Sequence, residues 1–433
     1  MRKFILSCMI YLIWTLPVFA QKNLTSTNVL PVITQLNELL QEALENNPHI
    51  KAAEQQWRAI SQQATQVSSF ADPIFTYTHW LSSVETRVGP MQNGFTLSQR
   101  FPFFGKLRFQ GDMARQDNEV AEQAYLATRR DVIYKVKYGY FDLYWIDQSL
   151  LILDEYQRLL QSFQQVAARK YATGIGIQAN ILKARVEITS IERRRLNFMK
   201  LREGAAARLN ALLGRSENES VGVINTMDTT LYTGSESELL QKAVTARQEI
   251  NASKAFIRKA ELGIRLAKRN YWPDITISAA YTTIPSGRTT ATDNGKDAWS
   301  IQAGINLPIW FGKRKAAVRE AKASRKASRM SYENLKNEVL AEIRDLYARL
   351  KASEQTVKLY RNNLIPDSER ALQSALSSYQ TGNLDFLTLL DSERMLLQFR
   401  LAYVKELANY RQQTAGLERA VGNESPLSSV ENN

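Results

Sequence analysis

The chain has 433 residues, of which 56 are lysine or arginine and 43 aspartate or glutamate, so its formal net charge is +13. This length is enough for two or three ordinary domains or for one elongated one. Apart from the run 193–195, the basic residues are spread along the chain. This spread indicates solvated helix faces and gives no reason to expect a nucleic acid partner.

The first 20 residues have the pattern of a secretory signal peptide. Arg2 and Lys3 precede an apolar run over residues 4–14, and small residues precede a cleavage point after Ala20. The run is shorter than the ~20 residues that a membrane-spanning helix needs, which disfavours an anchor. Because the only cysteine, Cys8, lies in this segment, the mature chain would contain none, and thiol or disulfide chemistry is excluded.

The rest of the chain contains one pattern twice. Four landmarks recur in the same order, some two hundred residues apart: Leu39-Leu40 with Leu239-Leu240, Phe104-Gly105-Lys106 with Phe311-Gly312-Lys313, Tyr171–Gly174 with Tyr379–Gly382, and Leu213-Gly214 with Val421-Gly422. We therefore expect a first structural repeat over residues 21–214 and a second over 236–422. Residues 215–235 would link them as an irregular segment, and the polar residues 423–433 are expected to be a disordered tail.

In each copy the sequence pattern predicts a helix, two short strands, a very long helix, a turn and a further helix. In the first copy these are a helix over residues 32–68, a hairpin over 73–102, a long helix from Lys106 and a tip turn over 171–176. In the second they are a helix over 236–270, a hairpin over 273–308, a long helix from Lys313 with a break near 362–366, and a tip turn over 379–384. Residues 106–170 contain no proline and would extend ~97 Å as a helix, which suits a coiled-coil tube better than a globular core.

The four strand segments alternate apolar and polar residues. In the last of them Trp299, Ile301, Ala303 and Ile305 alternate with polar or small residues, so one face of the sheet is apolar. A soluble sheet would pack this face on a core, whereas a membrane barrel would turn it to lipid. Aromatic residues and prolines flank one end of every strand, and aromatic residues prefer the boundary between lipid and water. The flanks therefore favour the membrane.

Each flank predicts a junction where a strand leaves the membrane and meets a helix. Proline ends the strand pairing, glycine allows the bend, and the lysine starts the helix in water with its ammonium group able to reach lipid phosphates. Four strands are too few to close a barrel, so the chain is expected to oligomerise. The junction residues are Pro102, Phe103, Phe104, Gly105 and Lys106 in the first copy, and Trp272, Pro273, Pro308, Trp310, Phe311, Gly312 and Lys313 in the second.

The duplicated pattern, the FPFFGK and LPIWFGK junctions and the YATG and YQTG turns resemble the TolC-type outer membrane efflux protein family. The resemblance implies a mixed fold, all-α with transmembrane β: a homotrimer with a twelve-stranded outer membrane β-barrel continuous with a long periplasmic α-helical barrel. It implies an exit duct that docks a periplasmic membrane-fusion adaptor and an inner-membrane transporter. Residues 84–90 and 379–391 resemble those of members serving heavy-metal pumps of the resistance–nodulation–division (RND) type.

The same resemblance places functional residues at the periplasmic tips. Tip turns and adaptor docking are expected at Tyr171, Gly174, Tyr379 and Gly382, with the glycines supplying a positive φ. The periplasmic gate is expected at Tyr379 and Asp391. Thr388 occupies the family's second acidic position, and Asp385 could supply acidity instead. Asp391 could equally be an exposed helix charge that pairs with Arg394, and both interpretations stay open here.

No catalytic constellation or cofactor site is visible in the sequence, and no enzymatic activity is expected. The mature chain has two histidines and no cysteine, and its methionines are scattered. Alternatives to the metal efflux duct are an outlet for type I protein secretion or drug efflux, and, in a different class, a periplasmic adaptor or coiled-coil scaffold.

Overall fold

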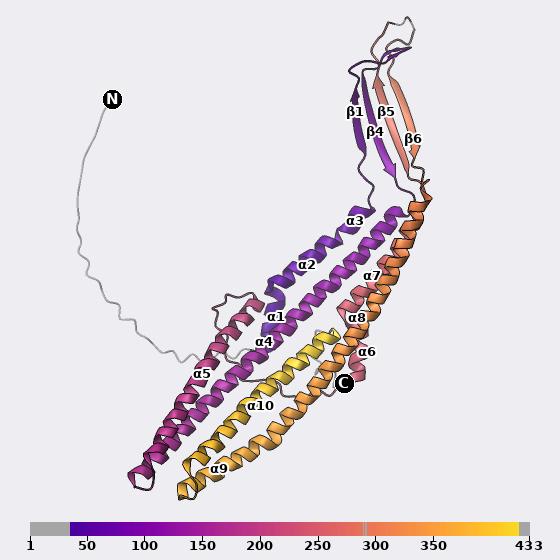
Figure 1. Ribbon diagram of the computed structural model, residues 1–433. Coiled ribbons are helices and arrows are strands. Elements are labelled where there is room, and N and C mark those ends of the chain that lie inside the picture. Colours follow the sequence, from indigo (N-terminus) through magenta and orange to yellow (C-terminus); the bar gives the residue numbers. More distant parts are fainter. Residues whose placement is uncertain (1–34, 289, 291, 424–433) are drawn as a thin grey trace, which may run out of the picture. The chain divides into compact units, whose positions relative to one another are not determined.

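The computed structural model describes residues 35–288, 290 and 292–423 (Figure 1). The expected signal peptide and the residues after Asn423 lie outside the described part of the chain. The first copy contains α1 (Leu36–Asn46), α2 (Pro48–Ser61), α3 (Gln63–Ser68), β1 (Ile74–His79), β2 (Glu85–Thr86), β3 (Gly89–Pro90), β4 (Asn93–Phe101), α4 (Lys106–Ala172) and α5 (Gln178–Leu213). The second contains α6 (Glu236–Ala246), α7 (Gln248–Arg269), β5 (Ile275–Thr283), β6 (Ala298–Ile305), α8 (Phe311–Leu359), a π-helix (Tyr360–Leu364), α9 (Ile365–Thr381) and α10 (Phe386–Val421).

The first helix of each copy is broken, where the sequence predicted continuous helices over 32–68 and 236–270. Asn47 has φ −62° and ψ 121°, and its side chain accepts hydrogen bonds from the N–H groups of His49 and Ile50. The following Pro48 disfavours helical dihedrals at Asn47, so this break is local chemistry. Arg247 breaks the second copy with almost the same dihedrals, φ −64° and ψ 126°, although no proline follows it. Its Nη1 donates to the carbonyl oxygen of Ala420 at 3.1 Å, so tertiary contact holds this second break.

The predicted interruption near residues 362–366 is one wide turn in a continuous helical path. The backbone N–H of Ile365 bonds to the carbonyl oxygen of Tyr360, five residues back, which is the π-helical pattern. Pro366 has no N–H, and its ring would clash with the carbonyl of Asn362 in a regular α-helix. The wider π turn just before Pro366 avoids this clash.

The four longer strands form one antiparallel sheet in the order β1-β4-β5-β6, so β4 and β5 join the two copies. The register pairs Phe75 with Leu97, Leu97 with Ala279, and Ala279 with Ile301, which puts the apolar residues of all four strands on one face. That face is not covered by any other described element: Phe75 is 65% exposed and Ile301 84%. The soluble alternative, in which this face packs on a core, is therefore not what the chain forms.

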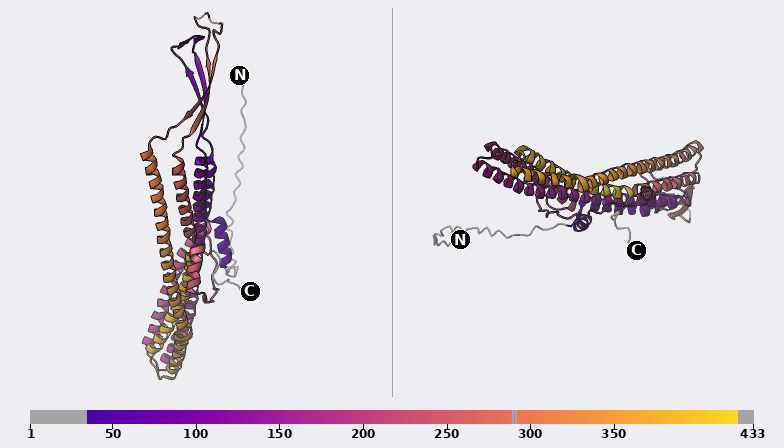
Figure 2. Two further views of the ribbon diagram at one scale, coloured as in Figure 1. Left: turned by 90° about the vertical axis from the view of Figure 1, so that its right-hand side faces the viewer. Right: turned by 90° about the horizontal axis from the view of Figure 1, so that it is seen from below.

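The helices lie side by side. Next to the strands, α4 lies between α7 on one side and α2 with α3 on the other, and α8 follows α7 (Figures 1 and 2). Away from the strands, α4 and α5 form one antiparallel hairpin and α9 and α10 form another, and buried residues of all four helices share one core. Among the described residues, no helix combines the length and apolar character needed to cross a membrane.

Candidate functional site: the strand–helix junctions and the helix tips

At the junction between sheet and helices, one carboxylate ties the two copies together. Asp274, which is 5% exposed, accepts hydrogen bonds from Lys106 Nζ at 2.7 Å and from the backbone N–H of Phe103 at 2.9 Å, and it pairs with Arg100 at 2.5 Å. Lys106 also donates to the carbonyl oxygen of Trp272 at 2.9 Å. The expectation that the ammonium of Lys106 reaches lipid phosphates is therefore wrong, because Asp274 holds it inside the junction. Lys313 is exposed, as expected.

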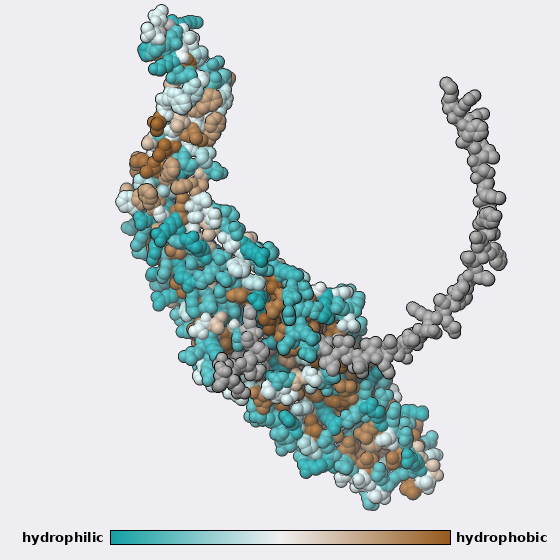
Figure 3. Space-filling view, turned by 180° about the vertical axis from the view of Figure 1, so that it is seen from behind, coloured by the Kyte–Doolittle hydropathy of each residue, from teal (hydrophilic) through white to brown (hydrophobic). Residues whose placement is uncertain are grey.

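The aromatic residues of the junction lie on the surface. Phe104 is 85% exposed and Trp310 72%, and Phe311 and Trp272 are also exposed. The ring of Trp272 stacks on that of Phe103 at 5.1 Å between centroids. Figure 3 shows apolar side chains gathered over the lower strands and this junction, whereas most of the helical surface is hydrophilic.

The prolines and glycines of the two junctions differ in their roles. Pro102 directly follows β4, and Pro308 and Pro273 lie just outside β6 and β5. Gly105 has φ +88° and precedes α4, as a bend-forming glycine should. Gly312 lies inside α8, which begins at Phe311, so its expected role as the bend is wrong. The second junction has one more residue between proline and glycine, and its turn is complete at Trp310, where φ is −81° and ψ 71°.

The tip turns use their glycines as predicted. Gly174 has φ +74° and Gly382 φ +88°, both in the left-handed region. The N–H of Gly382 donates to the carbonyl oxygen of Tyr379 at 3.2 Å, and the N–H of Gly174 to that of Tyr171 at 3.0 Å. These contacts close the helix ends before the chain reverses.

The two tip tyrosines lie in different environments. Tyr171 is 49% exposed, whereas Tyr379 is 4% exposed and packs on Phe386 with 5.2 Å between ring centroids. The ammonium of Lys170, from the other tip, lies 4.9 Å from the centre of the Tyr379 ring. Burial raises the pKa of the Tyr379 phenol, so it stays neutral. Tyr379 therefore joins the two tips.

The two predicted acidic gate residues are engaged within the chain. Asp385 caps α10: its Oδ1 accepts the N–H groups of Leu387 at 2.8 Å and Thr388 at 3.1 Å, and its Oδ2 accepts the Thr388 hydroxyl. The Thr388 side chain, together with these N–H groups, lowers the pKa of Asp385. Asp391 is exposed and pairs with Arg394 at 3.1 Å, as the alternative interpretation held.

Arg394 has a second partner that sequence analysis missed. Its Nη2 contacts Glu187 of α5 at 2.7 Å, and Glu187 is 8% exposed. Glu187 lies 13 residues after Gly174 and Arg394 lies 12 after Gly382. The two residues are thus one position out of register between the copies, so a comparison of equivalent positions does not reveal the pair.

An apolar groove lies beside this ion pair, between α5 and α10. Its volume is about 380 Å³. Val186 on its wall is 67% exposed and Leu182 51%. The lining residues are Ala179, Leu182, Lys183, Val186, Leu387, Leu390 and Arg394.

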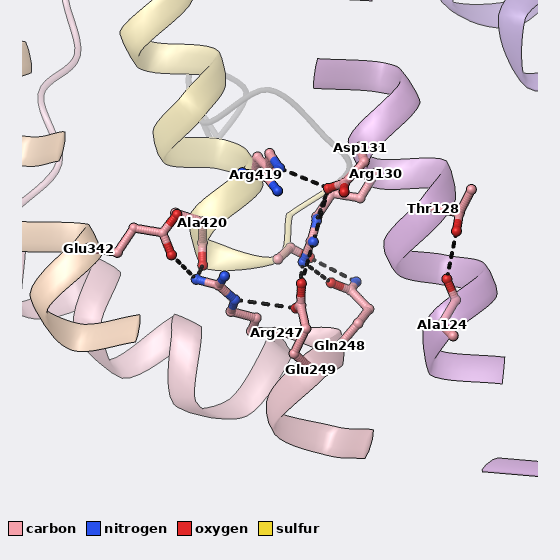
Figure 4. Close-up of polar contacts among 11 residues, drawn as sticks. Ala124, Thr128, Arg130, Asp131, Arg247, Gln248, Glu249, Glu342, Arg419 and Ala420 are labelled. Atoms are coloured by element: carbon pink, nitrogen blue, oxygen red, sulfur yellow. Dashed lines mark hydrogen bonds and ion pairs between the residues drawn. The ribbon is translucent and has the colours of Figure 1, made fainter. Parts of the chain in front are cut away.

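Midway along the helices, a charge network joins α4, α7 and α10 (Figure 4). The guanidinium of Arg130, 1% exposed, donates to both carboxylate oxygens of Glu249 at 2.7 and 2.9 Å and to Gln248 Oε1 at 2.8 Å. Asp131 accepts from Arg130 at 3.1 Å and from Arg419 at 2.8 Å. Sequence analysis singled out none of these residues because, apart from the adjacent Arg130 and Asp131, the partners lie more than one hundred positions apart.

In the described part of the chain, no group of three or more His, Cys, Asp or Glu side chains could hold a metal ion. The features that remain are an apolar sheet face, a charged junction and two linked tips. The family described as outer membrane efflux protein matches residues 39–215 and 239–423. The chain belongs to this family.

Relatives with known roles extend the comparison. The chain is similar to the cobalt-zinc-cadmium resistance protein CzcC of Cupriavidus metallidurans, with 23% identity over 321 residues, covering 73% of this chain and 74% of CzcC. It is also similar to the cation efflux system protein CusC of Escherichia coli O157:H7, with 23% identity over 384 residues, covering 85% of this chain and 82% of CusC.

The fold of this chain is also similar to that of solved outer membrane channels. A crystal structure of CusC superposes with a TM-score of 0.77 at 21% identity, covering 91% of this chain and 93% of that one. The predicted fold class, a duplicated unit of helices with a transmembrane β-hairpin in each copy, is confirmed. As a member of this family, the protein is an outer membrane efflux protein with a long periplasmic helical portion.

Proposed function

We propose that the protein is the outer membrane exit duct of a tripartite pump, in which three copies share one twelve-stranded β-barrel above a periplasmic α-helical barrel. The main support for this proposal is the four-stranded sheet. Its apolar face is exposed, and within the described chain β1 and β6 each pair on one side only. In lipid every backbone N–H and C=O needs a partner, so these edges must pair with other copies. Three copies supply twelve strands, enough to close a barrel.

The groove between α5 and α10 is the proposed docking surface for a periplasmic adaptor. Its floor is apolar, and Lys183 and Arg394 flank it. A helical hairpin with an apolar ridge and acidic flanks fits such a groove. The tip residues Tyr171, Gly174, Tyr379 and Gly382 would set the position of this surface.

The proposed periplasmic gate consists of Tyr379, Asp385 and Asp391. The cation–π contact from Lys170 to Tyr379 supports it, because this contact holds the two tips together. Opening the tips requires that contact to break. Conduction is then passive, and the energy comes from an inner-membrane transporter, which we propose to be of the RND type.

The proposed cargo is heavy-metal cations. The support is the names of the two relatives, one a cobalt-zinc-cadmium resistance protein and the other a cation efflux protein. Deleting the gene in its host should lower tolerance to such metals, and the wild-type gene should restore it. A deletion strain that becomes sensitive only to organic compounds would instead support the drug efflux alternative, and one with unchanged tolerance to both would contradict an efflux role.

The docking surface has its own test. Val186→Glu should lower metal tolerance while leaving the heat-modifiable oligomer intact in outer membrane extracts. Leu196→Glu is the matched control, since Leu196 is 56% exposed on the same helix but does not line the groove. An oligomer that dissociates in Val186→Glu alone would mean that the groove contacts another copy rather than an adaptor.

A further inference from the structure

A buried carboxyl group lies in the core between the two tip hairpins. Glu393 on α10 is 0% exposed, and neither of its carboxyl oxygens has a hydrogen-bond partner among the described residues. Tyr156 on α4 is 1% exposed, and its hydroxyl likewise has no partner there. Buried polar groups are nearly always paired, so two orphaned groups in one core require an explanation.

The charged groups around Glu393 do not neutralise it. Glu187 and Arg194 face it from α5 and Arg394 from α10 itself. Arg394 is engaged by Glu187 at 2.7 Å and Asp391 at 3.1 Å.

The charges around Tyr156 are likewise engaged with one another. Arg400 on α10 pairs with Glu155 of α4 at 3.0 Å and Glu369 of α9 at 2.6 Å. Arg194 lies close enough to lower the pKa of Glu393 but makes no hydrogen bond to it, so an ionised Glu393 would be a buried anion beside a second carboxylate and without a hydrogen-bonded cation among the described residues.

We propose that Glu393 is a proton-operated latch of the periplasmic tips, which keeps its proton while α4, α5, α9 and α10 are packed and releases it when they separate. This inference rests on the proposed function only in assigning a gate to the tips. Glu393 lies among Leu389, Leu390, Leu396 and Leu397, which pack in the core that both tip hairpins share. Separating the hairpins would wet this core and allow the carboxyl group to ionise.

The direction of the pH effect follows from the burial. Burial, and next the charge of Glu187, raise the pKa of Glu393 from 4.5 to about 8. The packed tip then binds a proton that the open tip, with an ordinary carboxyl group, gives up above pH 4.5. Between these two values, each unit of rising pH favours the open tip about tenfold. Above pH 8 both forms are ionised and the effect levels off.

Two measurements on the purified protein test the latch, and neither requires a working pump. Infrared spectroscopy should show the carbonyl band of a protonated carboxylic acid at pH 7. The band should be absent in Glu393→Gln and unchanged in Glu192→Gln, an exposed carboxylate on α5 that pairs with Arg195. A wild-type spectrum without this band, or a band that persists in Glu393→Gln, overturns the proposal.

Hydrogen exchange at residues 171–176 and 379–384 reports tip opening directly. Opening of the wild type should rise about tenfold per pH unit up to pH 8, after correction for intrinsic exchange. In Glu393→Gln it should be independent of pH. Identical pH profiles for the two proteins overturn the latch. If the variant does not fold, disappearance of the wild-type infrared band with a midpoint near pH 8 still supports the proposal, and a midpoint near 4.5 refutes it.

Discussion

The charge network around Arg130 makes a strong prediction about stability. Glu249→Gln keeps the shape of the side chain and removes its charge, which leaves the guanidinium of Arg130 buried at 1% exposure. Arg130 would retain the amide of Gln248 and a shared contact with Asp131. Glu249→Gln should therefore destabilise the fold, although it removes no atoms from the core.

The size of the effect can be worked out in two ways. Breaking a buried ion pair from one side costs about 3–5 kcal/mol, and the remaining contact with Asp131 reduces this to about 2–3 kcal/mol. Burial raises the pKa of Glu249, but hydrogen bonding and attraction by Arg130 outweigh it and lower the pKa from 4.5 to about 2. That shift corresponds to at most ~3.4 kcal/mol, and because the side chain is 35% exposed we halve it to ~1.7 kcal/mol.

The sign of the pH dependence distinguishes this pair from packing. A carboxylate whose pKa is lowered by folding stabilises the fold fully above pH 4.5, and the stabilisation is lost as the pH falls through about 2. The gap in unfolding free energy between wild type and Glu249→Gln should therefore narrow by about half between pH 7 and pH 3 and close only below about pH 2. Urea titrations followed by circular dichroism in detergent, at pH 7 and pH 3, measure it.

Two further variants sharpen the test. Glu54→Gln disrupts an exposed pair with Arg58 and should cost only about 0.3–0.5 kcal/mol. The double variant Arg130→Met with Glu249→Gln should recover most of the loss, because no buried charge is left unpaired. A cost below about 1 kcal/mol for Glu249→Gln at pH 7, or a gap that does not narrow at pH 3, would refute the reasoning.

Three other predictions concern the junction and the tips. Asp274→Ala leaves the buried Lys106 without its carboxylate and should cost about 3–5 kcal/mol, seen as a lower dissociation temperature of the oligomer, with the exposed Asp72→Ala as an unaffected control. Asp385→Ala should speed hydrogen exchange in the first turn of α10, whereas Asp385→Asn, whose side chain can still cap the helix, should not. If both variants lose metal tolerance equally, the charge of Asp385 matters rather than its capping role. Gly382→Ala should destabilise the tip by about 1–2 kcal/mol because φ is +88°, whereas Gly312→Ala, in a helix with open space around it, should stabilise by about 0.5–1 kcal/mol.

Patterns that repeat locally were readable from the sequence. Alternation identified the strands, and the absence of proline over residues 106–170 identified α4. The Asn47–Pro48 step carried a local break signal as well, although a continuous helix over 32–68 was predicted. The matching break at Arg247 has no local sequence signal, because contacts of Arg247 with Glu342 and Ala420, far along the chain, stabilise it.

Several charged side chains were missed for a related reason. A lysine at a helix start looks the same in sequence whether it meets lipid, as was expected of Lys106, or a buried carboxylate such as Asp274. Glu393 is different, because the sequence did carry a signal for it: Leu389, Leu390, Leu396 and Leu397 lie three and four positions before and after it, which puts the carboxyl group on the apolar face of the helix. A buried charge is defined by partners that only the fold supplies.

Many of the ion pairs that join distant helices connect the first copy to the second. Asp274 meets Lys106 at the strand junction, Glu249 meets Arg130 midway, and Arg394 meets Glu187 near the tips. At the offset of 200 that relates Leu39 to Leu239, the first-copy equivalents of Asp274 and Glu249 are Ile74 and His49.

The charges therefore carry information that the duplicated apolar stripes lack. Two copies of one unit present similar apolar faces, which bring helices together without deciding which helix lies beside which. A carboxylate present in only one copy makes that decision, because the buried arginine or lysine of the other copy is strongly destabilised against any other neighbour. Divergence of a few charged positions is thus enough to turn a repeated unit into one ordered chain, and substitutions at these positions should scramble pairing before they abolish helix formation.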